Sequence, residues 1–211
     1  MFRIKNYLKI KKYRNLLFLS TIFLIISLFL MSITGKYADS VAGAPLNDII
    51  LDAIPRINLS FMYVHIYLFV LILIIAYPLF FYPEKLPFTI FAVALIATIR
   101  AIFNAMTHLG PPVEDVELIL TGLPDILKGM YFKADLFFSG HVAIPTLGFF
   151  MFKERKIKWL WLFLIIVEIL VNLFMHTHYS IDVFAAPFFS YAVFKFSQYI
   201  FKENERFKLN Y

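Results

Sequence analysis

Six long apolar segments run along this chain of 211 residues, and they constrain its fold more than any other feature. Each segment has about 20 residues, which is the length that an α-helix needs to cross the hydrocarbon core of a bilayer. The segments cover residues 15–33, 59–80, 88–107, 136–152, 159–175 and 179–201. The sequence therefore predicts an all-α, polytopic membrane protein with six transmembrane helices in one bundle.

The composition agrees with a membrane protein and narrows the chemistry that the chain can perform. Hydrophobic residues make up 61% of the sequence and Phe alone fills 26 positions, far above the usage of a soluble domain. The chain has no cysteine, which excludes disulfide bonds, a thiolate nucleophile and a zinc site with thiolate ligands. Any chemistry must therefore use histidine, carboxylate or hydroxyl groups.

The basic residues are distributed unevenly between the two ends of the predicted helices. On one side lie Arg3, Lys5, Lys9, Lys11, Lys12, Arg14, Lys85, Lys153, Arg155, Lys156, Lys158, Lys195, Lys202, Arg206 and Lys208. On the other side lie only Lys36, Arg56, Arg100, Lys128 and Lys133. Because short cytoplasmic loops carry an excess of Lys and Arg, this distribution predicts that both termini are cytoplasmic. We attribute the net charge of +6 to basic residues that set the topology and attract anionic lipid. We expect no nucleic-acid partner.

The order of the segments leaves room for one domain and two short ends. We expect a basic cytoplasmic flank at 1–14, a six-helix catalytic membrane domain at 15–201 and a cytoplasmic tail at 202–211. The flank is either an interfacial helix or the positive charge that sets the topology, and we prefer the second interpretation. Residues 114–132 are too charged to span, so we interpret them as an external interfacial segment that could cover a site.

The predicted topology brings three chemically active regions to the external membrane face. They are His141 near the start of the fourth segment, the stretch "HTHYSID" at 176–182, and Arg100 toward the end of the third segment. Within that stretch His178 and Asp182 are four residues apart, so on the first turn of a helix they share a face. The carboxylate can then accept from one imidazole nitrogen and leave the other as a base or nucleophile.

The residues before His141 predict a phosphate site. In "SGH", Ser139 is placed to cap a helix, and Gly140 lets the backbone approach a ligand closely. The first amide groups of such a helix suit a phosphate. Two imidazoles beside a helix N-terminus and Arg100 predict phosphoryl transfer through a phosphohistidine, with Arg100 balancing the phosphate charge. Alternatively, Arg100 extends to the external interface as an anchor.

Four stretches of the sequence are similar to one known family. The stretches "DLFFSGH" at 135–141 and "HTHYSIDV" at 176–183 resemble the two catalytic motifs of the sphingomyelin synthases, a branch of the type 2 phosphatidic acid phosphatase superfamily. The stretches "RAIFNAMTHLGPP" at 100–112 and "APLNDIILDAIPRI" at 44–57 resemble the Arg-containing segment and the first external loop of the same family. The basic motif of the classical phosphatase branch, and its Pro before Ser-Gly-His, are absent, which favours the synthase-like branch.

The resemblance implies a lipid phosphotransferase whose site lies at the outer leaflet. A phosphorylated head group would move from a glycerophospholipid to an acceptor lipid such as ceramide or diacylglycerol, without a cofactor or a metal ion. His178, oriented by Asp182, would be the nucleophile, and His141 would protonate the departing lipid. The expected substrate-binding residues are Arg100, Asp135, Ser139, Gly140 and Tyr179.

Two alternative functions stay open. A lipid phosphate phosphatase or phospholipase C-like hydrolase would use the same residues, with water replacing the acceptor lipid. A non-enzymatic lipid-binding or transport protein would not need the intact set of two histidines and one carboxylate. The family pattern also changes at Phe103, Gly110 and Thr177, which leaves the head group and the acceptor open. A homo-oligomer is compatible with the sequence.

The remaining polar residues of the apolar segments also have two interpretations. Glu168 either supports the histidine site or makes a structural hydrogen bond to another helix. We expect His65, His108 and His176 to be structural. We interpret Asp135 as a cap or loop residue rather than a catalytic one, although it is part of a family motif.

Overall fold

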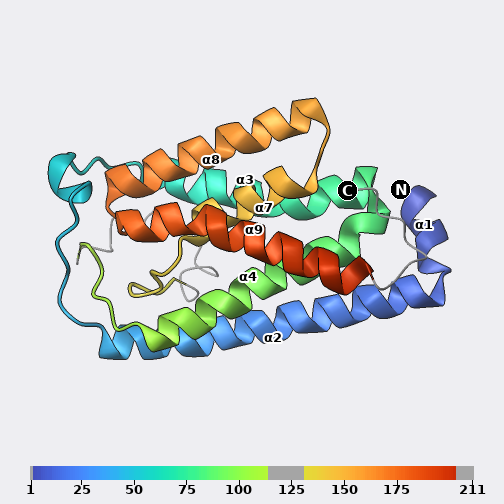
Figure 1. Cartoon of the computed structure of the whole chain (residues 1–211), viewed down its shortest axis with the longest axis horizontal. Helices are drawn as coiled ribbons and strands as arrows, with labels where there is room; N and C mark the ends of the chain where they lie inside the picture. Colours follow the sequence, from blue (N-terminus) through green and yellow to red (C-terminus); the bar gives the residue numbers. More distant parts are fainter. Residues whose placement is uncertain (1, 114–130, 203–211) are drawn as a thin grey trace.

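The computed structural model of the protein describes residues 2–113 and 131–202. Within these residues the chain forms seven α-helices and two short 3-10 helices (Figure 1). The α-helices are α1 (Phe2–Leu8), α2 (Lys11–Val41), α3 (Ser60–Phe81), α4 (Leu86–Met106), α7 (Gly140–Met151), α8 (Arg155–Met175) and α9 (Ser180–Lys202). The 3-10 helices are η1 (Leu51–Ala53) and η2 (Pro83–Lys85). The all-α prediction is confirmed, and each predicted apolar segment overlaps one of the six longer helices.

Four of these helices are long and apolar enough to cross a membrane. They are α2, α3, α8 and the continuous segment Pro83–Met106 that contains η2 and α4. Helix α7 is apolar but has only 12 residues, so it rises about 18 Å, well short of a hydrocarbon core of about 30 Å. Helix α9 has 23 residues but is not one of the four. The four helices indicate a multi-pass membrane protein, and the sixfold spanning topology stays a prediction.

Helix α7 lies in the centre of the bundle, and this position places the candidate site. It contacts α3, α4, α8 and α9, whereas α2 lies along α4 at one edge of the bundle (Figure 1). The close contact with α8 depends on Gly148, since a Cβ there would meet the Trp161 ring at 2.6 Å. Small residues allow this kind of approach between apolar helices. Most side chains of α7 are consequently buried.

Helix α7 begins later than the predicted segment 136–152, because Phe138 and Ser139 form backbone hydrogen bonds with other parts of the chain. The Phe138 carbonyl accepts a hydrogen bond from Arg100, and the Ser139 N–H donates to the Asp182 carbonyl at 3.1 Å. These backbone groups are satisfied by tertiary partners and do not extend the helix. The first turn of α7 is therefore fixed between α4 and α9.

A short turn joins α8 to α9 and brings His178 beside α7. His176 adopts a left-handed conformation with φ of 55°, and its N–H donates to the Leu173 carbonyl at 3.1 Å. This ending is common for helices but is rare at a residue other than glycine. His176 thus has a structural position, in the turn that reverses the chain within four residues.

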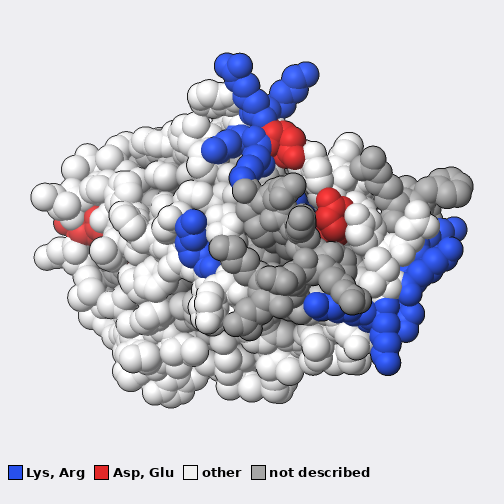
Figure 2. Space-filling view, turned by 45° about the vertical axis from the view of Figure 1, so that its right-hand side comes forward, with Lys and Arg blue, Asp and Glu red and all other residues white. Residues whose placement is uncertain are grey.

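Basic side chains gather at the opposite end of the bundle from this turn. The exposed ones include Lys5, Lys9, Lys11, Arg14, Lys153, Arg155, Lys156 and Lys158. They come from the N-terminal helices and from the turn between α7 and α8, which lie at one end of the molecule (Figure 1, Figure 2). The N-terminal flank itself contains helix α1. The predicted interfacial segment, apart from residues 131–132, and the C-terminal tail beyond residue 202 lie outside the described residues.

Candidate active site

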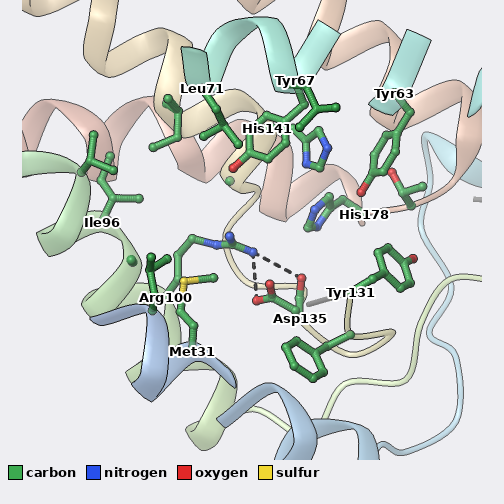
Figure 3. A pocket seen from close by; sticks show the side chains of 18 of the residues that line it. Met31, Tyr63, Tyr67, Leu71, Ile96, Arg100, Tyr131, Asp135, His141 and His178 are labelled. Atoms are coloured by element: carbon green, nitrogen blue, oxygen red, sulfur yellow. Dashed lines mark hydrogen bonds and ion pairs between the residues drawn. The ribbon is translucent and has the colours of Figure 1, made fainter. Parts of the chain in front are cut away.

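The two histidines singled out in the sequence lie at the polar end of one cavity. His141 is the second residue of α7, and His178 lies in the turn before α9. Their ring centroids are 6.4 Å apart, and both rings point into the same space in Figure 3. The structure therefore brings together residues that are 37 positions apart in the sequence, as expected.

Asp182 lies next to the imidazole of His178, although not in the way the spacing predicted. Helix α9 begins at Ser180, so His178 precedes the helix rather than lying on its first turn. Asp182 Oδ2 still lies 3.5 Å from His178 Nδ1, and it accepts a hydrogen bond from the Tyr179 N–H at 3.0 Å. A closure of a few tenths of an ångström would make the contact to His178 a hydrogen bond, and catalytic contacts often tighten in this way when substrate binds.

Arg100 is buried inside the bundle rather than extended to a membrane surface. Its Nε donates to the Phe138 carbonyl at 2.7 Å, and its Nη2 donates to Asp135 Oδ1 at 2.9 Å (Figure 3). The same Asp135 oxygen accepts from the side chain of Asn104. Asp135 is therefore a loop residue, as interpreted from the sequence, and its contact is with Arg100 rather than with either histidine.

Gly140 and Ser139 shape the start of α7. A Cβ on Gly140 would lie 3.0 Å from Arg100 Cζ and closer still to Nη1, so a side chain there would displace the guanidinium. Ser139 occupies the predicted N-cap position, but its hydroxyl makes no cap hydrogen bond and is buried without a partner among the described residues. The glycine therefore allows a cation beside the helix N-terminus, whereas Ser139 is fully buried and does not line the cavity.

Tyr179 holds loops beside the site and does not line the cavity. Its hydroxyl donates to the Gly110 carbonyl and accepts from the Leu46 N–H, both at 2.8 Å. These two bonds hold separate loops against the start of α9. Tyr179 does not line the cavity, and its phenol is used in loop contacts, so the expectation that it binds substrate directly has no support from its position.

The first loop is fixed to the same turn by Asp48. Its Oδ2 accepts from the Ser180 N–H at 2.7 Å, and its Oδ1 accepts from the N–H groups of Ile50 and Leu51. Burial alone would raise the pKa of Asp48, but these hydrogen bonds outweigh burial and hold the pKa below its ordinary value. An ionised carboxylate thus anchors the loop beneath the turn that carries His178.

The cavity has a volume of about 280 Å³ and is polar at one end and apolar along its length. The polar end contains Arg100, Asp135, His141 and His178 (Figure 3). The apolar walls come from α2, α3 and α4, and include Leu24, Leu28, Leu71, Val93 and Ile96. A cavity with this division suits an amphiphile that has a charged group and a hydrocarbon chain.

Sequence reasoning missed two residues that touch His141. Tyr63 and Tyr67 of α3 stack on the imidazole with ring centroids 4.1 and 3.9 Å away. A signal was available, because two tyrosines four residues apart within an apolar helix share one face and need polar or aromatic partners. Glu168 of α8 is also fully buried, and neither of its carboxyl oxygens has a hydrogen-bond partner among the described residues.

The other histidines lie away from the cavity. His65 is exposed on α3, and the His108 ring is 3.3 Å from the Tyr37 hydroxyl.

A comparison with curated proteins finds no match to the chain. A comparison with protein families does find one, and the matched part contains α7, α8, most of α9, both candidate catalytic histidines and Asp182. Over residues 134–199 the chain matches the family model described as PAP2 superfamily C-terminal.

Proposed function

We propose that this protein is a membrane phosphotransferase that moves a phosphorylated head group between lipids through a phosphohistidine. The donor is a glycerophospholipid, and the acceptor is a lipid with a free hydroxyl such as ceramide or diacylglycerol. The observation that carries the proposal is the pair of imidazoles 6.4 Å apart, one of them backed by Asp182, at the polar end of an otherwise apolar cavity. The PAP2 superfamily match supports phosphoester chemistry of the phosphatase or transferase kind.

In the first step His178 attacks the phosphorus atom of the donor lipid. Asp182 holds the imidazole by its Nδ1 edge, so the opposite nitrogen is the nucleophile. A P–N bond forms while the bond between phosphorus and the diacylglycerol oxygen breaks. His141 donates a proton to that leaving oxygen, which makes diacylglycerol a neutral product.

In the second step the roles of proton donor and acceptor reverse. Neutral His141 takes the proton from the acceptor hydroxyl, whose oxygen attacks phosphorus and breaks the P–N bond to His178. Arg100 stabilises the charge on the phosphoryl oxygens in both steps. If water takes the place of the acceptor, the same groups hydrolyse the phosphohistidine, so a lipid phosphatase or phospholipase C-like hydrolase is the second candidate, which the superfamily match also supports.

In this proposal all six longer helices form one membrane domain, with both termini in the cytoplasm and the site at the extracytoplasmic face. The arrangement of charge supports it, since the basic residues gather at the end of the bundle opposite the turn that carries His178. The excess of Lys and Arg normally marks the cytoplasmic side. The donor and acceptor lipids would then come from the outer leaflet.

Lipid mass spectrometry on purified protein in liposomes tests the proposal. Phosphatidylcholine, phosphatidylethanolamine, phosphatidylinositol and phosphatidic acid are supplied separately, with and without ceramide. A transferase gives diacylglycerol and ceramide that carries the phosphorylated head group in equal amounts, and only when acceptor is present. A hydrolase gives diacylglycerol and a water-soluble phosphorylated head group without ceramide. The control is His65→Ala on the exposed face of α3, which should match wild type, and absence of all these products would contradict both candidates.

A further inference from the structure

The imidazole of His141 lies between two tyrosine rings. Its plane makes an angle of 23° with the ring of Tyr63 and 27° with the ring of Tyr67, at centroid distances of 4.1 and 3.9 Å (Figure 3). Both tyrosines come from α3, one helical turn apart, so a single helix face supplies the two rings. His141 is thus stacked on both faces, and only the edge of the imidazole is left to meet a substrate.

The two rings are held in place by the surrounding helices. Tyr63 is buried and packs in a cluster with Val64 of α3 and with Val171 and Met175 of α8. The Tyr67 hydroxyl lies beside the start of α7, 3.4 Å from where a Cβ of Gly140 would stand. The stack therefore joins three helices and is built into the fold rather than lying on a free surface.

We propose that Tyr63 and Tyr67 are positioning residues that hold the His141 ring and favour its imidazolium form, the proton donor of the first step. This inference rests on the proposed function. The face of an aromatic ring attracts a cation whose centre lies within about 6 Å, and both tyrosine faces meet this condition. A flat contact on both sides also prevents rotation of the imidazole about its long axis.

The charges around His141 explain why aromatic rings suit this position. Arg100 of α4 opposes a second cation, as does His178 when it is protonated, whereas Asp135 and Asp182 favour one. A carboxylate in direct contact would stabilise the imidazolium more strongly, but it would repel a phosphate and compete for the proton. Tyrosine rings stabilise the cation without adding negative charge to a site that must accept an anion.

The proton that His141 holds goes to the leaving oxygen as the P–O bond breaks and the P–N bond to His178 forms. Removal of a ring should therefore slow only those reactions that need this proton. A diacylglycerol oxygen is a poor leaving group and needs the proton from His141. A nitrophenol leaving group departs with little protonation, so the same defect should hardly affect its release.

The test compares leucine and phenylalanine substitutions at the two positions with both kinds of substrate. Tyr63→Leu and Tyr67→Leu should each lower kcat on natural phospholipid roughly tenfold, with KM unchanged, and should leave kcat on the nitrophenyl analogue of that phospholipid near wild type. Tyr63→Phe and Tyr67→Phe keep the stacked ring and should keep wild-type kcat on both. In a His141→Ala background the leucine substitutions should have no further effect, since their target is gone.

Helix α3 also supplies a matched control. Phe61 stacks on His65 at 4.1 Å and 23°, the geometry of the Tyr63 contact, but this pair is exposed. Phe61→Leu should leave both activities unchanged. Equal losses on both substrates in the leucine variants would overturn the inference, because general damage to the fold does that. Phenylalanine variants as slow as the leucine variants would also overturn it. A wild-type protein inactive on both substrates would instead refute the proposed function.

Discussion

At the scale of single residues, the guanidinium of Arg100 has two edges with different surroundings. Nε and Nη2 donate to Phe138 and Asp135, whereas Nη1 faces Gly140 at the start of α7. In the proposed reaction a phosphate would bind on the Nη1 side, which Asp135 does not occupy. We expect Arg100→Ala to lower kcat/KM on phosphatidylcholine in liposomes about 100- to 1000-fold, the usual effect of removing one preorganised donor. Arg100→Lys should lower it less, because Lys keeps the charge but loses the fork.

The control for this prediction is Lys36→Ala, which removes an exposed cation of α2. It should leave kcat/KM unchanged. Thermal unfolding of each variant in the same detergent separates loss of activity from loss of fold, since Arg100→Ala leaves the Asp135 carboxylate without its ion pair. Wild-type activity in both Arg100 variants would mean that the residue has a structural role alone.

His141 and His178 should fail at different points when each is replaced. His178→Ala removes the proposed nucleophile and should show essentially no turnover and no covalent intermediate with any substrate. His141→Ala lacks the proposed proton donor, so it should lose turnover of natural phospholipid but still form phosphohistidine slowly from a nitrophenyl analogue. The intermediate should then persist, because no base remains to activate the acceptor.

The observable is a labelled head group on His178 that is stable in alkali and labile in acid. Mass spectrometry of proteolytic peptides separates the His178 region from the His141 region. Equal rescue of both variants by the nitrophenyl analogue would remove the distinction between the two roles. A label on His141 would reverse them.

At the scale of elements, one ionised carboxylate, Asp48, helps to hold the first loop against the start of α9. The pKa of Asp48 lies below its ordinary value of about 4, since hydrogen bonds outweigh burial. Asp48 therefore stabilises the fold fully above about pH 4, and this stabilisation is lost as the pH falls through the lower folded-state pKa. We expect Asp48→Asn to lower Tm by a few degrees at pH 7, with the difference from wild type shrinking toward pH 3.

Intrinsic tryptophan fluorescence during heating in detergent measures this difference, since Trp161 is buried in the bundle. Asp52→Asn is the control, because Asp52 lies in the same loop and is exposed. The control should follow the wild-type pH dependence. A constant gap between wild type and Asp48→Asn at all pH values would show that the charge of Asp48 does not hold the loop.

The helices and the two histidine motifs could be predicted from the sequence, because apolar length and local spacing carry that information. The start of α7 could not, since Phe138 and Ser139 are held by Arg100 and Asp182, partners from distant helices. The stack of Tyr63 and Tyr67 on His141 was missed for the same reason. Which helix faces another in a bundle depends on close packing at small residues, such as Gly148 against the ring of Trp161. No local sequence pattern predicts which residues come into contact.

At the scale of the whole molecule, the absence of cysteine makes the topology directly testable. Ile49 is 87% exposed in the loop near the site, and Lys156 is exposed in the basic turn at the other end. In intact cells, Ile49→Cys should react with an impermeant thiol reagent. Lys156→Cys should react only after permeabilisation. The wild-type chain gives the background, and the reverse labelling pattern would place the site in the cytoplasm.

The apolar walls of the cavity also determine how the concentration of substrate should be counted. They are built by α2, α3 and α4, and the outer face of α2 exposes Phe18, Ile25 and Phe29, which suit contact with lipid tails. A molecule whose chain lies between such helices arrives from the two-dimensional bilayer rather than from water. The rate should then follow the mole fraction of substrate in the membrane, so adding inert lipid would slow turnover even though the total amount of substrate in the sample stays the same.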